Sequence, residues 1–148
     1  MSPLSADDRL AILDLLGRWN LYEDSGQAQA WAGLFTTDGM SISLTGKVLA
    51  GHEALAANAS KRWAMKEARL SAHWMNAPII TGTADRAHVE HYGVMVSRPA
   101  DREPELRMET HAVRRYEFIK TDGEWRILHR TISAFPEPDR SAGATTTR

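Results

Sequence analysis

The sequence contains no cysteine among its 148 residues. This absence excludes a disulfide framework, a thiol redox pair and a thiolate metal site. The charges nearly cancel, because the formal net charge at pH 7 is -1. Nucleic-acid binding depends on many phosphate contacts by lysine and arginine, so this balance argues against a nucleic-acid partner.

Long apolar runs are missing as well. No run approaches the ~18 residues that a membrane-spanning helix needs, and the N-terminus places acidic residues ahead of its apolar stretch, unlike a signal peptide. We therefore expect a soluble, cytoplasmic protein with no membrane partner.

Phosphate-binding glycine patterns and a Gly-x-Ser-x-Gly elbow are also absent. The sequence thus predicts no cofactor and no nucleophilic serine. What remains is an ordinary globular composition, with 43% hydrophobic and 25% charged residues. The length suits one domain with a core and an internal pocket. We expect that domain at residues 1–135, followed by a disordered tail at 136–148 that has little to bury.

The first half of the chain has helical patterns. Ser5 followed by Asp8 resembles a capping box and predicts a helix from Ala6, and apolar residues then recur at helical spacing as far as Trp19. Beyond it we expect a short helix, a short strand and a third helix, at Gln27–Phe35, Met40–Leu44 and Gly51 to about Ala68.

The second half alternates like strands, at Ala72–Thr81, Ala87–Ser97, Leu106–Lys120 and Glu124–Phe135. Asp122-Gly123 is a strong hairpin signal, and Pro78 places its strand at an edge or at a bulge. Helices that precede a run of antiparallel strands predict an α+β fold, with three helices packed on one face of a curved sheet. A sheet curled around a helix leaves a concavity, which small-molecule sites favour.

Asp24, His73 and His111 lie at chemically suggestive places in this layout. Asp24 ends the first helix, His73 begins the first long strand, and His111 lies midway along the third. A buried histidine needs a partner, and a carboxylate would orient the ring and raise its pKa. The three residues indicate proton transfer on a small organic molecule. A lone strand histidine is, however, more often a surface or core residue.

Other side chains receive plainer interpretations. His88 and His91, with Glu90 between them, could suggest a metal ligand set, but alternation along a strand points the two histidines to opposite faces, so we predict no metal site. The tryptophans are most simply core residues, and some could line a pocket. We expect the basic residues Arg114, Arg115, Arg126 and Arg130 on a solvated sheet edge rather than in an anion site.

Several segments together resemble a known family. Trp31–Gly39, the helix start at Gly51–Leu55 and the closing Asp122–Ile127 resemble the SnoaL-like branch of the nuclear transport factor 2-like superfamily, over roughly Ser5 to Ser133. That resemblance implies a cone-shaped α+β barrel in which three helices and a strongly bent, mostly antiparallel sheet surround a deep pocket. It also implies a homo-oligomer, either a dimer or a trimer.

Within that branch, the positions of Asp24, His73 and His111 are similar to those of scytalone dehydratases. The Asp24–His73 pair alone also resembles the dyad of hexachlorocyclohexane dehydrochlorinase. The likeness implies a cofactor-independent lyase in which Asp24 orients His73 as the base, and His111 hydrogen-bonds the substrate or the leaving oxygen. Glu23 stands where those dehydratases have a tyrosine, and a second tyrosine on the first short strand has no counterpart, so their own substrate is not implied.

The expected substrate is a small, hydrophobic, cyclic or aromatic molecule, for which the candidate binding residues are Tyr22, Trp19, Trp63 and His129. The resemblance leaves open an isomerase, a polyketide cyclase, an epoxide hydrolase or a non-catalytic ligand-binding or assembly module. A non-catalytic module would place Asp24 and His73 too far apart for a hydrogen bond, or would fill the pocket with side chains.

Overall fold

The structure is a computed structural model that describes residues 2–65, 70–99 and 105–135. The described helices are α1 (Ala6–Asp24), α2 (Ala28–Ala32) and α3 (Gly51–Ala64). The strands are β1 (Phe35–Ile42), β2 (Val48–Ala50), β3 (Ser71–Met75), β4 (Ile79–Gly82), β5 (Arg86–Ser97), β6 (Arg107–Thr121) and β7 (Glu124–Ala134). Helices followed by a strand meander confirm the predicted α+β class.

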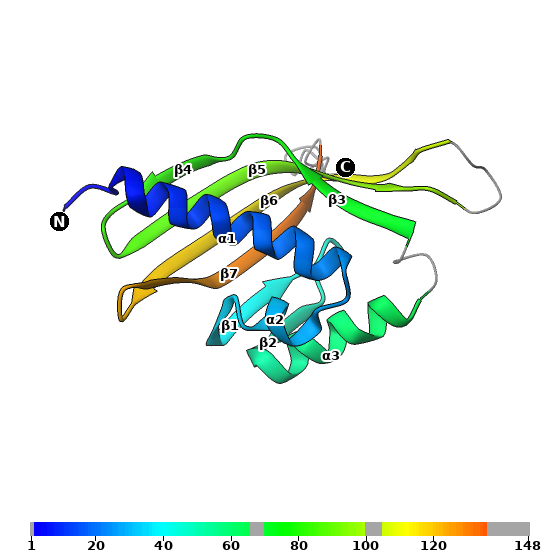
Figure 1. Ribbon diagram of the computed structural model, residues 1–148, viewed down its shortest axis with the longest axis horizontal. Coiled ribbons are helices and arrows are strands. Elements are labelled where there is room, and N and C mark those ends of the chain that lie inside the picture. The colour runs from blue at the N-terminus through cyan, green and yellow to red at the C-terminus, as the bar shows by residue number, and fades with distance from the viewer. Residues whose placement is uncertain (1, 66–69, 100–104, 136–148) are drawn as a thin grey trace, which may run out of the picture.

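The strands form one curved sheet in the order β2-β1-β7-β6-β5-β3, with β4 also pairing with β5. Every pair is antiparallel except β1 with β7. The sheet does not close, since β2 and β3 remain at its two ends, so the cone is an open one rather than a complete barrel. Helix α1 crosses one face of the sheet, and α2 and α3 lie together beside β1 and β2 (Figure 1).

The start of α1 is capped as predicted, and it is also tied to the sheet. The Ser5 hydroxyl accepts a hydrogen bond from the backbone N–H of Asp8 at 3.1 Å. The Asp8 carboxylate accepts hydrogen bonds from Lys120 Nζ at 2.7 Å and from Trp125 Nε1 at 2.9 Å. Asp8 therefore anchors the first turn of α1 to the β6–β7 hairpin.

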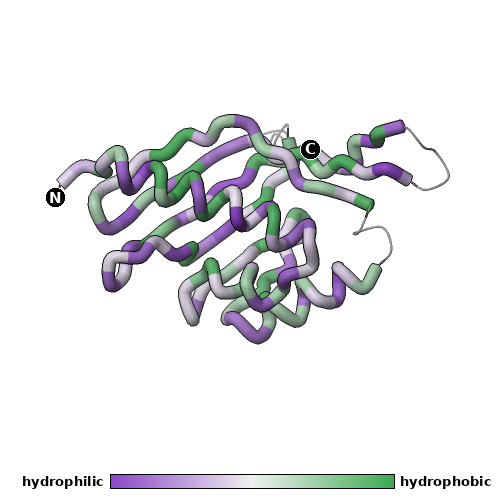
Figure 2. The backbone as a smooth tube through the Cα atoms, in the orientation of Figure 1, coloured by the Kyte–Doolittle hydropathy of each residue, from purple (hydrophilic) through white to green (hydrophobic). Residues whose placement is uncertain are grey.

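The core lies between α1 and the inward face of the sheet. Ile12, Leu16 and Trp19 of α1 are almost completely buried, and they belong to the same core cluster as Phe118 and Ile127 of the sheet. Hydrophilic and hydrophobic residues alternate along the strands (Figure 2), as expected where one sheet face is buried. Among the described helices, none is both long and apolar enough to cross a membrane.

Several predicted boundaries need correction. The strand expected at Ala72–Thr81 is two strands, β3 and β4, because Pro78 between them cannot donate to a ladder. The first strand begins at Phe35 rather than Met40, and the three-residue β2 was not predicted. The expected end of the third helix near residue 68, part of the loop after Ser97, and the expected tail at 136–148 lie outside the described residues.

A β-bulge in β7 changes which side chains face inward. Along the β6–β7 ladder Phe118 pairs with Ile127 and Glu117 pairs with His129, so Leu128 is an extra residue without a cross-strand partner. The side chain of Ile127 therefore points inward, and the next side chain of β7 to point inward is that of Arg130. His129 faces outward as a result.

Candidate active site

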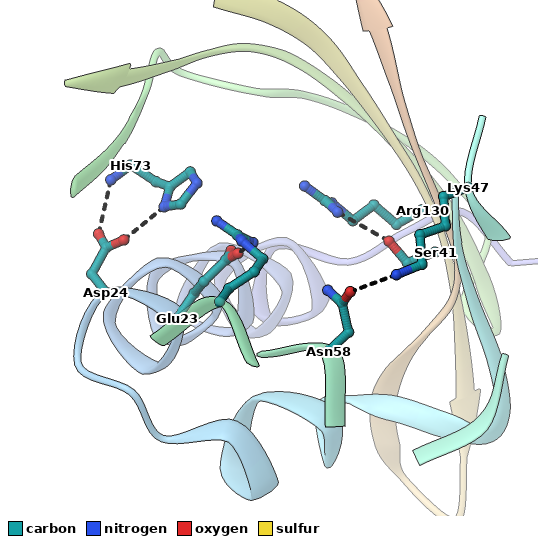
Figure 3. Close-up of polar contacts among 8 residues, drawn as sticks. Glu23, Asp24, Ser41, Lys47, Asn58, His73 and Arg130 are labelled. Carbon is teal, nitrogen blue, oxygen red and sulfur yellow. Dashed lines mark hydrogen bonds and ion pairs between the residues drawn. The ribbon is translucent and has the colours of Figure 1, made fainter. Parts of the chain in front are cut away.

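Asp24 and His73 form a hydrogen-bonded pair, as the sequence predicts. Asp24 is the last residue of α1, and His73 lies on β3. Nδ1 of His73 lies 2.6 Å from Oδ1 of Asp24, and the backbone N–H of His73 donates to Oδ2 at 2.8 Å. The carboxylate thus holds both the strand and the ring (Figure 3). With Asp24 ionised, Nδ1 carries the ring proton and leaves the lone pair on Nε2.

His73 borders a cavity of about 300 Å³, at the small end of the range for ligand sites, with Asp24 behind it. Its walls come from α2, α3, β2, the segment between β1 and β2, and the inward faces of β1, β3, β5, β6 and β7. Besides His73, the lining includes Trp31, Ser41, Asn58, Arg62, Met95, Thr110, Ala112, Arg114, Arg130 and Ile132. His73 and Arg130 project toward each other from opposite sides of this space (Figure 3).

The pKa of His73 lies below its ordinary value of 6.5. Burial is the largest cause, because it disfavours the charged ring, and the hydrogen bond to Asp24 opposes it by raising the pKa. Asp24 therefore acts in the expected direction, but burial outweighs it. The ring is neutral near pH 7 and is able to accept a proton.

Arg114 and Arg130 are buried, which contradicts the expectation of a solvated edge. Their exposed fractions are 4% and 7%. The Arg130 guanidinium lies 4.5 Å from the centre of the Trp19 ring and donates to Ser41 Oγ at 3.0 Å, and that of Arg114 lies 5.5 Å from the same ring. Burial lowers the pKa of both arginines. Arg115 and Arg126 do lie on more exposed positions, paired with Glu90 and Glu124.

Arg62 of α3 forms an ion pair with Glu23 of α1 at the same end of the fold. The Glu23 side chain is 7% exposed, so the residue that replaces the dehydratases' tyrosine is itself part of the interior. Arg62 and Met95 also border a second cavity, of about 440 Å³, which is further lined by Met65, Leu70, Ser71 and Glu109 among others.

His111 does not join the dyad, so the prediction that it shares the cavity is wrong. Its neighbours Thr110 and Ala112 line the cavity, and alternation along β6 points His111 through the other side of the sheet. There the exposed ring lies 6.0 Å from the Phe135 ring, centre to centre.

The four candidate substrate-binding residues lie in different parts of the structure, and none of them lines the cavity. Trp19 is 1% exposed and lies behind the cavity, where its ring contacts that of His73 edge-on at 5.7 Å. Tyr22 is half-buried against the core and is absent from the cavity lining. Trp63 packs on Gly26, where its ring occupies the place that a Cβ would need. His129 faces outward and pairs with Glu117 because of the bulge at Leu128.

The prediction that His88 and His91 face opposite sides is confirmed. His88 is exposed, with Nδ1 3.8 Å from Glu117, whereas His91 is buried and stacks on Tyr116 at 5.6 Å. In the part of the chain that the structure describes, no group of three or more metal-binding side chains comes together.

The sequence interpretation missed Glu23, Arg62, Arg114 and Arg130 as site residues. A signal for Arg114 was available, since on a strand it shares a face with Ala112 and Tyr116, which are residues suited to a core. No comparable signal existed for Arg130, whose inward direction depends on the bulge.

Comparisons with known proteins agree with this fold. Residues 5–131 match the sequence family described as SnoaL-like domain, whereas no curated protein matches. A protein of unknown function with a cystatin-like fold from Nostoc punctiforme is 27% identical, with a TM-score of 0.79 over 93% of this chain and 98% of that chain.

Two structures from Novosphingobium aromaticivorans are similar in fold. An NTF2-like protein with a cystatin-like fold is 20% identical, with a TM-score of 0.81 over 95% of this chain and 90% of that chain. A structure named "Putative Scytalone Dehydratase" is 17% identical, with a TM-score of 0.71 over 84% of this chain and 82% of that chain. The chain belongs to the SnoaL-like domain family, and its fold is the NTF2-like, cystatin-like cone.

Proposed function

We propose that the protein is a cofactor-independent lyase of the dehydratase type, acting on a small cyclic or aromatic molecule. The observation that carries the proposal is the 2.6 Å contact between His73 Nδ1 and Asp24 Oδ1 at the wall of a cavity of about 300 Å³. A positioned, neutral imidazole with a carboxylate behind it is a complete proton-transfer device.

In the proposed reaction, Nε2 of His73 removes a proton from a carbon next to a carbonyl or similar activating group. The electrons of that C–H bond pass into the activating group, and Asp24 stabilises the imidazolium that forms. When the electrons return, a carbon–carbon double bond forms and the C–O bond to the leaving group breaks. The imidazolium then gives its proton to the departing oxygen, so that water leaves and His73 is neutral again.

Arg130 takes the place that the sequence interpretation gave to His111. Negative charge develops on the activating oxygen, and stabilising it requires a donor fixed on the side of the cavity opposite the base. The Arg130 guanidinium faces His73 across the cavity (Figure 3), and its hydrogen bond to Ser41 holds it there. An oxygen bound by Arg130 would leave the neighbouring carbon facing His73.

Two further observations favour catalysis over a non-catalytic module. Such a module would separate Asp24 from His73 or fill the pocket, whereas the two side chains are hydrogen-bonded and the space beside them is open. Similarity in fold to the structure named "Putative Scytalone Dehydratase" is compatible with a lyase.

The test is a screen of small cyclic hydroxy-carbonyl compounds for loss of water, followed by His73→Ala and Asp24→Asn on any substrate found. Removing a positioned acid/base group should lower kcat by roughly 10²–10⁴-fold. His111→Ala is the matched control, because that histidine lies on the other face of the sheet, and it should keep wild-type kcat. Wild-type rates in both dyad variants would rule the proposal out.

A further inference from the structure

The charged groups of the cavity do not balance. Arg62 is paired with Glu23, whereas Asp24 is hydrogen-bonded to the neutral ring of His73, so that three arginines stand against two carboxylates. Arg114 and Arg130 are buried and form no ion pair with any carboxylate of the described residues; only the Tyr116 hydroxyl and, for Arg114, the charge of Asp24 partly compensate them. Removing an unpaired charge from water is costly unless another charge or a set of acceptors compensates for it.

The polar atoms left without partners near the cavity include several N–H donors. Nε and Nη1 of Arg114, Nε of Arg130 and Nε1 of Trp31 are buried, with no acceptor among the described residues. All three residues line the cavity. The four donor atoms are closed off from solvent in the ligand-free fold, so a ligand that brings acceptor atoms and negative charge would meet them once these side chains turn toward the cavity that they line.

The position of Arg114 depends on a glycine. A Cβ at Gly93, on the neighbouring strand, would lie 2.5 Å from Nε and 2.7 Å from Cζ of Arg114. Only a residue without a side chain leaves room for the guanidinium to lie across β5. The guanidinium groups of Arg114 and Arg130 both lie over the ring of Trp19. These contacts keep Arg114 inside the fold.

We propose that Arg114 binds a carboxylate carried by the ligand of this cavity, beside the group that Arg130 faces. The ligand class is a small aromatic or cyclic carboxylic acid, because the donors adjoin apolar wall residues such as Trp31, Ala112 and Ile132 in a space of about 300 Å³. This assignment depends on the proposed function in one respect, which is that it treats the ligand as the substrate. Arg114 would then fix the ring while Arg130 and His73 act on it.

The binding experiment uses benzoate as the probe, with neutral benzamide and inorganic phosphate as comparisons, followed by calorimetry or by tryptophan fluorescence. Wild-type protein should bind benzoate at least about tenfold more tightly than benzamide, since a charged hydrogen bond contributes roughly 1.5–3 kcal/mol. Arg114→Met should weaken benzoate binding by about 10- to 100-fold. Arg115→Met, the next residue on the outer side of β6, is the matched control and should bind like wild type.

Gly93→Ala is a second variant that keeps every charge. It should displace the Arg114 guanidinium and weaken benzoate binding while leaving the fold intact, because the atoms in its way belong to a flexible side chain. The unfolding midpoint of ligand-free Arg114→Met should equal or exceed that of wild type, since the variant replaces an unpaired buried charge by an apolar side chain.

Four results would overturn the inference: no benzoate binding by wild type, equal affinity for benzoate and benzamide, phosphate binding as tight as benzoate binding, or an unchanged affinity in Arg114→Met. A much lower unfolding midpoint in that variant would also overturn it by giving Arg114 a structural role. Failure of the lyase proposal is distinguishable, because His73→Ala should bind benzoate normally whether or not it retains turnover.

Discussion

At the scale of single residues, His73 is subject to two opposing effects. Burial lowers the pKa of its ring, and the hydrogen bond to Asp24 raises it, with burial the larger. A base must be unprotonated to act. Because the net effect on the pKa is a lowering, the His73 ring is unprotonated near neutral pH. Asp24 then contributes orientation, tautomer and stabilisation of the imidazolium, rather than a pKa above the ordinary value.

This balance predicts the pH dependence of the reaction. For wild type, kcat/KM should rise through an acid limb centred below pH 6.5 and then level off, since protonating His73 removes the base. In Asp24→Asn the group that raises the pKa is gone, so the limb should move to lower pH while the plateau falls by roughly 10²–10⁴-fold. A limb that moves to higher pH would contradict the assignment, and His111→Ala should leave it in place.

Stability should also depend on the buried histidines. Burial lowers the pKa of both His73 and His91 below 6.5, so the unfolded chain binds more protons than the folded one in acid. The free energy of unfolding should therefore fall as the pH drops through 6.5 and below. Urea titrations at pH 7.5 and 5.5 measure the loss, which His91→Gln should reduce. An equal loss in His91→Gln would show that His91 does not contribute.

At the scale of elements, the carboxylate of Asp8 joins α1 to the β6–β7 hairpin. Hydrogen bonds from Lys120, Ser5 and Trp125 hold the pKa of Asp8 well below its usual range. Asp8→Asn should therefore lower the urea midpoint at pH 7 more than Asp7→Asn does, since Asp7 is an exposed acid in the same helical turn. Equal effects would mean that the carboxylate contributes only through the helix dipole.

The elements also show how far the sequence predicts the site. Local chemistry identified the start of α1 through Ser5, and the hairpin through Asp122-Gly123, whose residues both adopt positive φ. Position along the chain was enough to propose Asp24 with His73. Once the inward face of β6 is known, strand alternation places Arg114 in the cavity and His111 outside it. The direction of Arg130 could not be predicted, because it follows from a bulge at Leu128 that reverses the alternation and has no local signature.

At the scale of the whole molecule, the open curved sheet explains why a cavity exists at all. Helix α1 fills the concavity near its start, where Ile12 and Leu16 are buried, and at its far end Asp24 meets His73 beside the open space. The outer sheet face carries exposed aromatic residues, with Trp74 57% and Tyr92 52% exposed.

The homo-oligomer expected from the family resemblance stays a prediction at this scale. If the outer face is covered by another copy, light scattering should give the mass of a dimer or trimer, and Trp74→Glu should shift the protein toward monomer. His111→Ala serves as a comparison, because it changes the same face without adding a charge and should shift the oligomer less. A monomer at all concentrations would refute this prediction but would leave the proposals about the cavity unaffected.

The central claim is that His73 is a neutral base held by Asp24 at the wall of the cavity. Nitrogen NMR of the histidine rings across a pH titration tests it most directly, with His73 assigned by comparison with His73→Ala. If His73 is such a base, its ring should carry the proton on Nδ1 near pH 7 and should titrate below 6.5. A proton on Nε2, or a titration at or above 6.5, would contradict it.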